Sequence, residues 1–440
     1  MRSSASTRSI GSRWSRPARS SRGPSPAAVL AALVATTLLA APAAWPGAGQ
    51  EPDPPGATRP QRDIRDVLRT LRHREPAAPD TGGEAGSRRR TVILTPFLNY
   101  NPATSVIFGA AVLTSIYHGD PRATFPSTVQ AGASVSLENQ IGVSAKIDVY
   151  SDRDRWLFQA NPAWARYPQS TYDLGTDSPD SSQVGVDLDI PKLLLSVYRQ
   201  VLPDLFVGVG FQYVAHTGIG ASEGSGTRWD GSEYVEYSLE KGFDLEEQSS
   251  AGVSANLLFD RRDSPVNASR GWFANATLRA SFRDFLGGTS SWQELYVDLR
   301  NYRSLDRDAR HRLALWIYTD IVTGGAAPYF DLPATGAVPR GRAGRGYDGS
   351  RFRGERMAYA ELEYRATLTR DGLLGVVGFL NTQTFSAGRG GDGLFESHAL
   401  GAGTGLRILV DKRTKSNLCL DVGFGKGGSR GLWAGFQEAF

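Results

Sequence analysis

The chain ends with Gly431-Leu432-Trp433-Ala434-Gly435-Phe436-Gln437-Glu438-Ala439-Phe440, in which Leu432, Phe436 and Phe440 fall on the same alternate positions. A period of two predicts a β-strand. A soluble domain rarely ends on its strongest strand, whereas the last strand of a transmembrane β-barrel must pair with the first to close the wall. The segment therefore favours a barrel, with an ordinary edge strand as the alternative.

The same alternation recurs between residues 91 and 440. In the segment 358–368, Ala360 and Leu362 share one face, and Glu361 and Glu363 share the other. Charges confined to one face of many strands indicate that one face meets lipid and the other a polar interior. We predict an all-β fold, a single transmembrane antiparallel β-barrel of about sixteen strands over residues 91–440.

The composition agrees with a large β protein. The 440 residues include 50 glycines, 10% aromatic residues and only 40% hydrophobic residues. The lone Cys419 excludes an internal disulfide framework and a cysteine metal site, and five scattered histidines argue against a zinc centre. We expect no cofactor and no metal.

Residues 1–43 are predicted to be a signal peptide. The segment holds six arginines and no acid, followed by an apolar run over 27–41 and the cleavage pattern Ala41-Pro42-Ala43. A signal anchor is the alternative. Removal of the segment takes the formal charge from +4 to −2, so the basic pI of the full chain does not indicate nucleic-acid binding.

Residues 44–90 are rich in Pro, Gly and charge and are predicted to be a disordered periplasmic linker. Within it, Ile64, Val67, Leu68 and Leu71 have helical spacing, which predicts a short amphipathic helix over 61–74. Isolated helices of this length are marginal. The alternatives are a docking element for a periplasmic protein and a plug inside the barrel.

An even strand count places both chain ends on the same side of the membrane, which we expect to be the periplasm. The long segments 219–245 and 323–354 both follow odd-numbered predicted strands and would then face outward. Together with the signal peptide, this predicts the outer membrane of a Gram-negative-type bacterium, with N- and C-termini periplasmic and with outer-membrane lipids, including lipopolysaccharide, as partners.

One basic segment carries a specific combination of residues. It contains Arg345-Gly346-Tyr347 and Arg351-Phe352-Arg353, shortly before the predicted strand at 360–365. A flexible external loop that touches lipopolysaccharide phosphates is one interpretation. The combination also resembles the Arg-Gly-Phe/Tyr loop of the BamA/TamA-type outer-membrane assembly superfamily, also called the bacterial surface antigen family.

Further segments carry the same resemblance. The segment 259–267 with Gly271-Trp272-Phe273 is similar to the family's turn between strands eight and nine. The pattern Gly435-x-x-Glu438-x-Phe440 is similar to its terminal insertion signal, with Glu438 where an apolar residue is commoner. These motifs cover about 246–440, and residues 91–245 share only the alternating pattern.

The resemblance implies that the loop folds into the lumen and that Arg345 bonds an acidic residue of the inner wall. The family's wall partner comes from a Phe-x-Asp-x-Gly pattern, where this chain has Phe379-Leu380-Asn381-Thr382-Gln383. Asn381 carries no charge, so Glu361 or Glu363 is the candidate substitute. Family members with assembly activity also carry POTRA domains, for which the segment 44–90 is too short. The resemblance therefore implies a barrel-only member.

Other chemical motifs are weak. Asp260, Asp263 and Asp284 suggest a cation site, but the arginines between the first two pair those charges. The run Gly401-x-Gly403-x-Gly405 is better explained by tight packing in a strand than by phosphate binding. His216 and His398 lack a recognisable Ser–Asp frame.

The predicted function is assistance to protein insertion, or lipid handling, at a lateral seam between strands 91–98 and 430–440. Gly431 and Gly435 would let the last strand bend, and Phe436 and Phe440 would belong to the seam and terminal signal. No enzyme activity is expected. The rival functions are a passive channel or porin, a barrel enzyme using His216 or His398, and a structural barrel that docks a partner through the helix.

Overall fold

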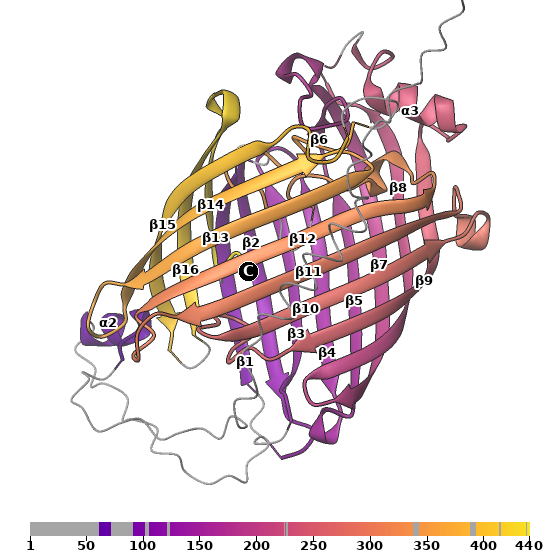
Figure 1. Ribbon diagram of the computed structural model, residues 1–440. Coiled ribbons are helices and arrows are strands. Elements are labelled where there is room, and N and C mark those ends of the chain that lie inside the picture. Colours follow the sequence, from indigo (N-terminus) through magenta and orange to yellow (C-terminus); the bar gives the residue numbers. More distant parts are fainter. Residues whose placement is uncertain are drawn as a thin grey trace, which may run out of the picture. The chain divides into compact units, whose positions relative to one another are not determined.

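The computed structural model describes residues 61–71, 91–101, 105–120, 124–223, 225, 228–337, 343–387, 393–412, 415–436 and 438–440. Figure 1 shows that strands of one sheet dominate this part of the chain. The predicted signal peptide and most of the predicted linker lie outside the described residues and stay predictions.

Within the described ranges the sheet contains seventeen strands. Their bounds are β1 Thr91–Asn101, β2 Ser105–Ile116, β3 Ser127–Ser136, β4 Ile141–Tyr150, β5 Trp156–Arg166, β6 Gln169–Thr171, β7 Val184–Leu202, β8 Leu205–Ala221, β9 Glu247–Asp260, β10 Gly271–Ser281, β11 Trp292–Ser304, β12 His311–Gly325, β13 Arg356–Thr367, β14 Leu374–Phe385, β15 Ala399–Asp411, β16 Ser416–Gly425 and β17 Arg430–Phe436.

Sixteen of these strands form the wall of a barrel. Antiparallel ladders join neighbours along the chain from β1–β2 to β16–β17, and β5 pairs directly with β7. The three-residue β6 pairs only with the start of β7, within the β5–β7 connection. The first and last strands, β1 and β17, contact each other. The predicted fold, an all-β barrel of about sixteen strands, is confirmed.

The connections differ in length at the two ends of the barrel. At one end, here the turn end, short segments join strands, such as 368–373 between β13 and β14 and 412–415 between β15 and β16. At the other end, here the loop end, long segments hold helix α3 (Glu233–Lys241) and the 3-10 helix η5 (Tyr329–Asp331). Figure 1 shows α3 and β6 at this loop end.

The burial of the wall is the reverse of that in a soluble protein. On β13, Glu361 and Glu363 are 1% and 0% exposed, whereas their neighbours Leu362 and Tyr364 are 48% and 42% exposed. Charged side chains are rarely fully buried unless paired, and large apolar ones are normally inside. This arrangement suits a barrel whose interior is polar and whose outer face meets lipid.

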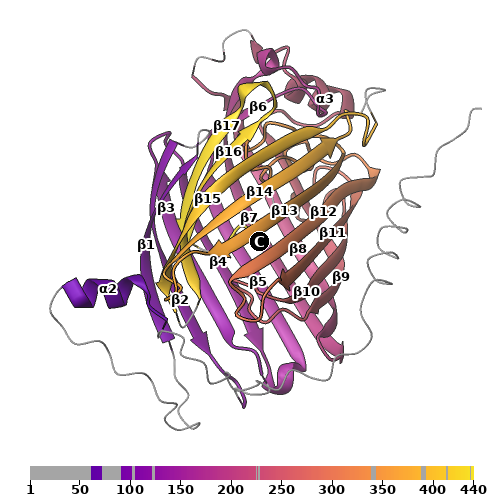
Figure 2. The same ribbon diagram turned by 60° about the vertical axis from the view of Figure 1, so that its left-hand side comes forward.

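Helix α2 (Ile64–Leu71) lies at the turn end, outside the wall (Figure 2). The Arg62 amide donates to the Asp371 carbonyl at 2.9 Å, and Lys412 Nζ lies 2.7 Å from Asp66 Oδ2. The helix therefore joins the β13–β14 and β15–β16 turns. It begins at Ile64 rather than at residue 61 of the predicted span 61–74, and residues 72–74 lie outside the described residues. No helix in the described part of the chain is long and apolar enough to cross a membrane.

The last strand also differs from its predicted span of 430–440, because β17 ends at Phe436. Leu432 faces outward and Trp433 inward, so a continued strand would place Glu438 on the outward face. A carboxylate facing lipid is unfavourable. Glu438 and Phe440 are instead buried, at 1% and 3% exposure. Both views show the chain end, marked C, within the outline of the barrel (Figures 1 and 2).

Candidate functional site

The candidate site begins with a tight turn in the β12–β13 connection. Gly344 and Gly346 have φ values of +76° and +114°, which side chains rarely tolerate. The Tyr347 amide donates to the Gly344 carbonyl at 3.0 Å and closes the turn. The glycines therefore allow Arg345 to project from a sharp bend into the barrel interior.

Arg345 lies among three carboxylates of the inner wall. Its Nη1 donates to Asp421 Oδ2 at 2.9 Å, and its Nη2 donates to Glu361 and Glu363. All four side chains are fully buried. Burial disfavours the charged guanidinium, but the three carboxylates outweigh it and raise the pKa of Arg345. The guanidinium carbon also lies 3.7 Å from the centre of the Phe379 ring.

Asn381, the third candidate wall partner, contacts the loop in another way. Its Nδ2 donates to the main-chain oxygen of Arg345 at 2.9 Å rather than meeting the guanidinium. The structure therefore places Glu361, Glu363 and Asn381 together around Arg345. It adds Asp421, which sequence reasoning did not select as a partner.

Glycines of β15 and β16 make room for the loop. A Cβ at Gly401 would come within 2.6 Å of the Arg345 carbonyl oxygen, and a Cβ at Gly423 within 2.8 Å of the Gly346 amide nitrogen. A Cβ at Gly403 would lie 2.1 Å from the Val422 carbonyl oxygen. The glycine run on β15 thus permits close packing.

The other motif residues fix the rest of the loop. The Tyr347 hydroxyl donates to the Leu400 carbonyl at 2.5 Å and accepts from the Lys426 amide at 2.8 Å. The Phe352 ring packs against Tyr347, with ring centres 5.2 Å apart. Arg351 reaches the neighbouring β6–β7 connection, where its Nη2 donates to Asp180 at 2.6 Å.

Arg353 is buried below η5. Its Nη1 donates to three main-chain oxygens, those of Tyr329, Phe330 and Leu332, at 3.1–3.3 Å. Burial lowers the pKa of this arginine. The guanidinium therefore ties together the two halves of the β12–β13 connection.

The end of the chain occupies the same interior. Glu438 Oε2 accepts from Arg407 Nε at 2.8 Å, and Glu438 Oε1 accepts from Asn417 Nδ2 at 2.8 Å. The Phe440 ring lies 5.1 Å from the Trp316 ring, and its main-chain oxygen accepts from Arg365. We call residues 438–440 the lumen tail.

The loop and the lumen tail are linked through shared partners. Asp421 accepts hydrogen bonds from both Arg345 and Arg407. Glu363 likewise lies between Arg345 and Arg365, with Arg365 Nη2 at 2.5 Å. One continuous network of buried charges therefore connects the loop, the walls of β13, β15 and β16, and the tail.

The predicted seam residues are distributed between β17 and the tail. Gly431 and Gly435 face inward on β17, opposite Gly423 and Cys419 of β16. A Cβ at Gly431 would lie 2.2 Å from the Trp433 ring. The Phe436 side chain lies outside the described residues. Phe440 lies in the lumen, so its predicted place on the last strand is corrected.

The histidine and aspartate motifs do not assemble a recognisable reaction centre. His216 Nδ1 is 3.9 Å from Asp331 Oδ1, but the Ser250 hydroxyl donates to Asp331, at 2.5 Å, rather than to the histidine. Asp260 pairs with Arg262 at 2.7 Å. Among the described residues, no cluster of potential metal ligands is found.

Solved structures provide the comparison that bears on this geometry. BamA from Haemophilus ducreyi lacking POTRA domains 1-3 is similar with a TM-score of 0.53 and 12% identity, over 79% of this chain and 70% of that one. The barrel has the fold of BamA. CdiB from Acinetobacter baumannii gives a TM-score of 0.51 and 13% identity, over 80% and 59% of the two chains. CdiB from Escherichia coli gives 0.50 and 11%, over 78% and 62%.

At these identities the similarity to BamA and CdiB establishes the fold alone. No protein-family model matches the sequence, and no curated protein matches it significantly. The BamA-like fold places the Arg345 loop and the lumen tail inside one barrel, but their role has to be argued from their own contacts.

Proposed function

We propose that this chain is a Gram-negative outer-membrane barrel of the BamA/TamA type that assists protein insertion, or lipid movement, at the junction of β1 and β17. The turn end and both chain termini would face the periplasm, and the loop end the outside. The BamA-like fold and the outward apolar faces of the wall support this location.

The short closing strand is the observation that carries the proposal. β17 has seven residues, whereas β1 has eleven and β16 has ten. The tail then leaves the wall for the lumen, where Glu438 is bound. A short closing strand offers its neighbour few backbone partners, and unpaired backbone groups in a membrane attract another strand.

The buried charge network would control this junction. Arg407 holds the tail through Glu438, and Arg345 holds the loop through the same Asp421 that Arg407 contacts. Movement of the lumen tail would therefore disturb the loop, and movement of the loop would disturb the lumen tail. The mechanism is mechanical, and no covalent step is involved.

The close packing around the charge network counts against a passive channel on that side of the lumen. Arg345, Trp316 and Glu363 are each 0% exposed, and Tyr359 is 2% exposed. Their packing leaves little free space around the network. We therefore expect low conductance from the purified protein in planar bilayers.

The direct test is insertion of a newly made porin into liposomes that hold the purified protein. Empty liposomes and liposomes with the exposed-site variant Arg307→Ala serve as controls. Faster insertion that falls with Arg345→Ala supports an insertase. Unchanged insertion with faster lipid exchange between leaflets supports lipid handling, and the absence of both effects rejects the proposal.

A further inference from the structure

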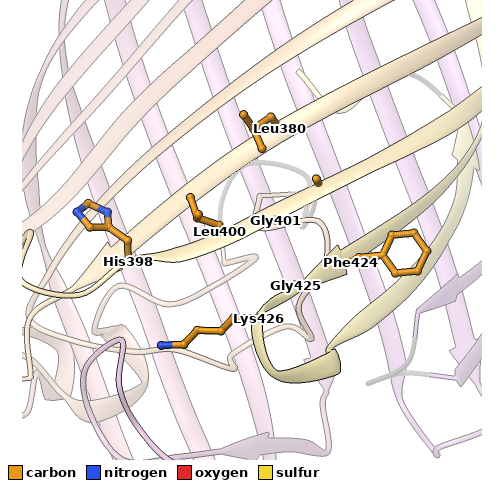
Figure 3. A pocket seen from close by; sticks show the side chains of 8 residues that line it. Leu380, His398, Leu400, Gly401, Phe424, Gly425 and Lys426 are labelled. Carbon is orange, nitrogen blue, oxygen red and sulfur yellow. The ribbon is translucent and has the colours of Figure 1, made fainter.

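A hollow of about 360 Å³ lies on the outward face of β14, β15 and β16, close to the loop end (Figure 3). Its floor follows from the strand register, in which Leu380 pairs with Ala402 and Ala402 pairs with Phe424. A methyl group between a leucine and a phenylalanine leaves a notch in the wall. We call this hollow the outer groove.

The outer groove is apolar and faces away from the lumen. Leu380, Leu400 and Phe424 line it and are 57%, 61% and 56% exposed. The adjacent Asn381, in contrast, is buried on the inner face. Side chains with this orientation would meet hydrocarbon in a membrane.

Two nitrogen-bearing side chains stand at one end of the groove. Figure 3 shows His398 and Lys426 beside the apolar residues, and both belong to the loop end of their strands. The Lys426 side chain is 69% exposed, with its ammonium 3.5 Å from Asp177. His398 Nδ1 lies 3.5 Å from the Thr382 hydroxyl. An ammonium with this exposure can reach an anionic oxygen.

We propose that the outer groove binds an anionic membrane lipid, with an acyl chain in the notch at Ala402 and a phosphate at Lys426 and His398. Apolar surface at membrane depth and positive charge at headgroup level match the two parts of such a lipid. The inference rests on the proposed membrane location but not on an opening seam.

The loop inside the barrel holds the main chain that forms the floor of the outer groove. The Tyr347 hydroxyl, on the inner side, bonds the main chain of both Leu400 and Lys426. Gly425 lines the groove, and a Cβ there would lie 2.6 Å from the Tyr347 ring. The loop that carries Arg345 therefore holds the backbone that positions Lys426, so the site exists before the lipid arrives.

The test measures binding of lipid A, a phosphorylated glycolipid, to the purified full chain in detergent by native mass spectrometry. Lys426→Gln is expected to weaken binding about fivefold, the effect of one cation near an anionic surface. Lys426→Arg should bind like the wild type. Lys415→Gln, which changes an exposed lysine at the turn end of β16, is the matched control and should change nothing.

The acyl-chain half of the site has its own variants. Ala402→Trp fills the notch and should reduce binding at least tenfold, with Ala402→Leu intermediate. Ala133→Trp, on the outward face of β3, is the control. Heat-modifiability on gels verifies that each variant is folded.

Two competitors test the headgroup and the acyl chains of the lipid separately. Neither glucosamine 1-phosphate nor uncharged diacylglycerol should displace lipid A at concentrations at which lipid A saturates. Equal binding by wild type, Lys426→Gln and Ala402→Trp would overturn the proposal, and so would full displacement by glucosamine 1-phosphate. Because no insertion is measured, failure of the insertion assay leaves this result intact.

Discussion

Glu438 and Arg407 form a buried ion pair, 2.8 Å between Oε2 and Nε, that holds the end of the chain inside the barrel. The side chains are 1% and 6% exposed. Arg407 also contacts Asp421, which pairs with Arg345 of the loop. The residues after the closing strand are therefore anchored to the network that holds the loop.

Replacement of Glu438 by glutamine should release the lumen tail. Removing one member of a buried ion pair typically costs about 3–5 kcal/mol, because the partner's charge is left unbalanced. We expect the lower part of this range, since Arg407 keeps Asp421. Urea unfolding in detergent measures the loss, with the exposed-site variant Glu396→Gln as control. An unfolding free energy equal to that of the wild type would refute the assignment.

Arg345→Met should destabilise the barrel more than Glu438→Gln does, because three buried carboxylates lose the cation they share. Asp421 keeps Arg407 and Glu363 keeps Arg365, so the largest cost falls on Glu361. Arg345→Lys should recover little of the lost stability, since a lysine ammonium lacks the planar guanidinium that bonds several carboxylates at once. The double variant Arg345→Met/Glu361→Gln should recover part of the lost stability. Purely additive effects in this double-mutant cycle would show that the two residues are not coupled.

Gly423→Ala should displace the loop without removing any charge. The added Cβ would lie 2.8 Å from the Gly346 amide nitrogen, which is main chain and cannot rotate away. Overpacking of this kind costs about 1–3 kcal/mol. Gly378→Ala on β14 is the matched control, because a Cβ there meets nothing within 4 Å. Similar unfolding midpoints for the two variants would contradict the close packing of loop and wall.

The loop end should become less stable as the pH rises towards neutrality. Burial raises the pKa of Asp331 to about 7, against the lowering effect of the Ser250 hydrogen bond. Glu294 adds to the rise, and Lys192 and Arg353 oppose it. The pKa of Asp331 in the folded protein therefore exceeds the unfolded value of about 3.9. The stabilisation that the protonated carboxyl gives the folded state is complete below about pH 4 and is lost as the pH rises from about 4 to 7.

Limited proteolysis of the β12–β13 connection at pH 5 and pH 8 measures this effect. Cleavage should be faster at pH 8 in the wild type. Asp331→Asn, which is neutral at both values, should remove the difference. A wild-type cleavage rate that does not vary with pH, after correction for the protease's own profile, would show that Asp331 does not titrate in this range.

The alternation in the sequence, together with the predicted signal peptide and the aromatic end of the chain, predicted the barrel and the inward charges. Glu361 and Glu363 stand on the charged face of one strand, and the resemblance of the Arg345 segment to the BamA/TamA-type loop made them candidate partners of that arginine. Asp421 could not be selected in the same way. It lies 76 positions from Arg345 along the chain, and only the closure of the wall brings the two together.

The course of the last residues was mispredicted because a period of two continues through Phe436 to Phe440. One signal in the sequence argued against a continued strand, because such a strand would place Glu438 on the outward face. A partner at Arg407 in the lumen is more favourable than lipid for this carboxylate. The buried carboxylate of Glu438 therefore outweighs the alternating pattern, and the chain leaves the strand.

The central claim, that the β1–β17 junction opens during function, is tested most directly by a reversible cross-link. In a Cys419→Ser background, a cysteine at Leu432 or Ala434 of β17 is combined with one at Val92 or Leu94 of β1, and the pair that oxidises is kept. Porin insertion into liposomes is then measured before and after reduction. We predict that the oxidised protein inserts no faster than empty liposomes and that reduction restores the wild-type rate. Equal rates in the two states would contradict an opening junction.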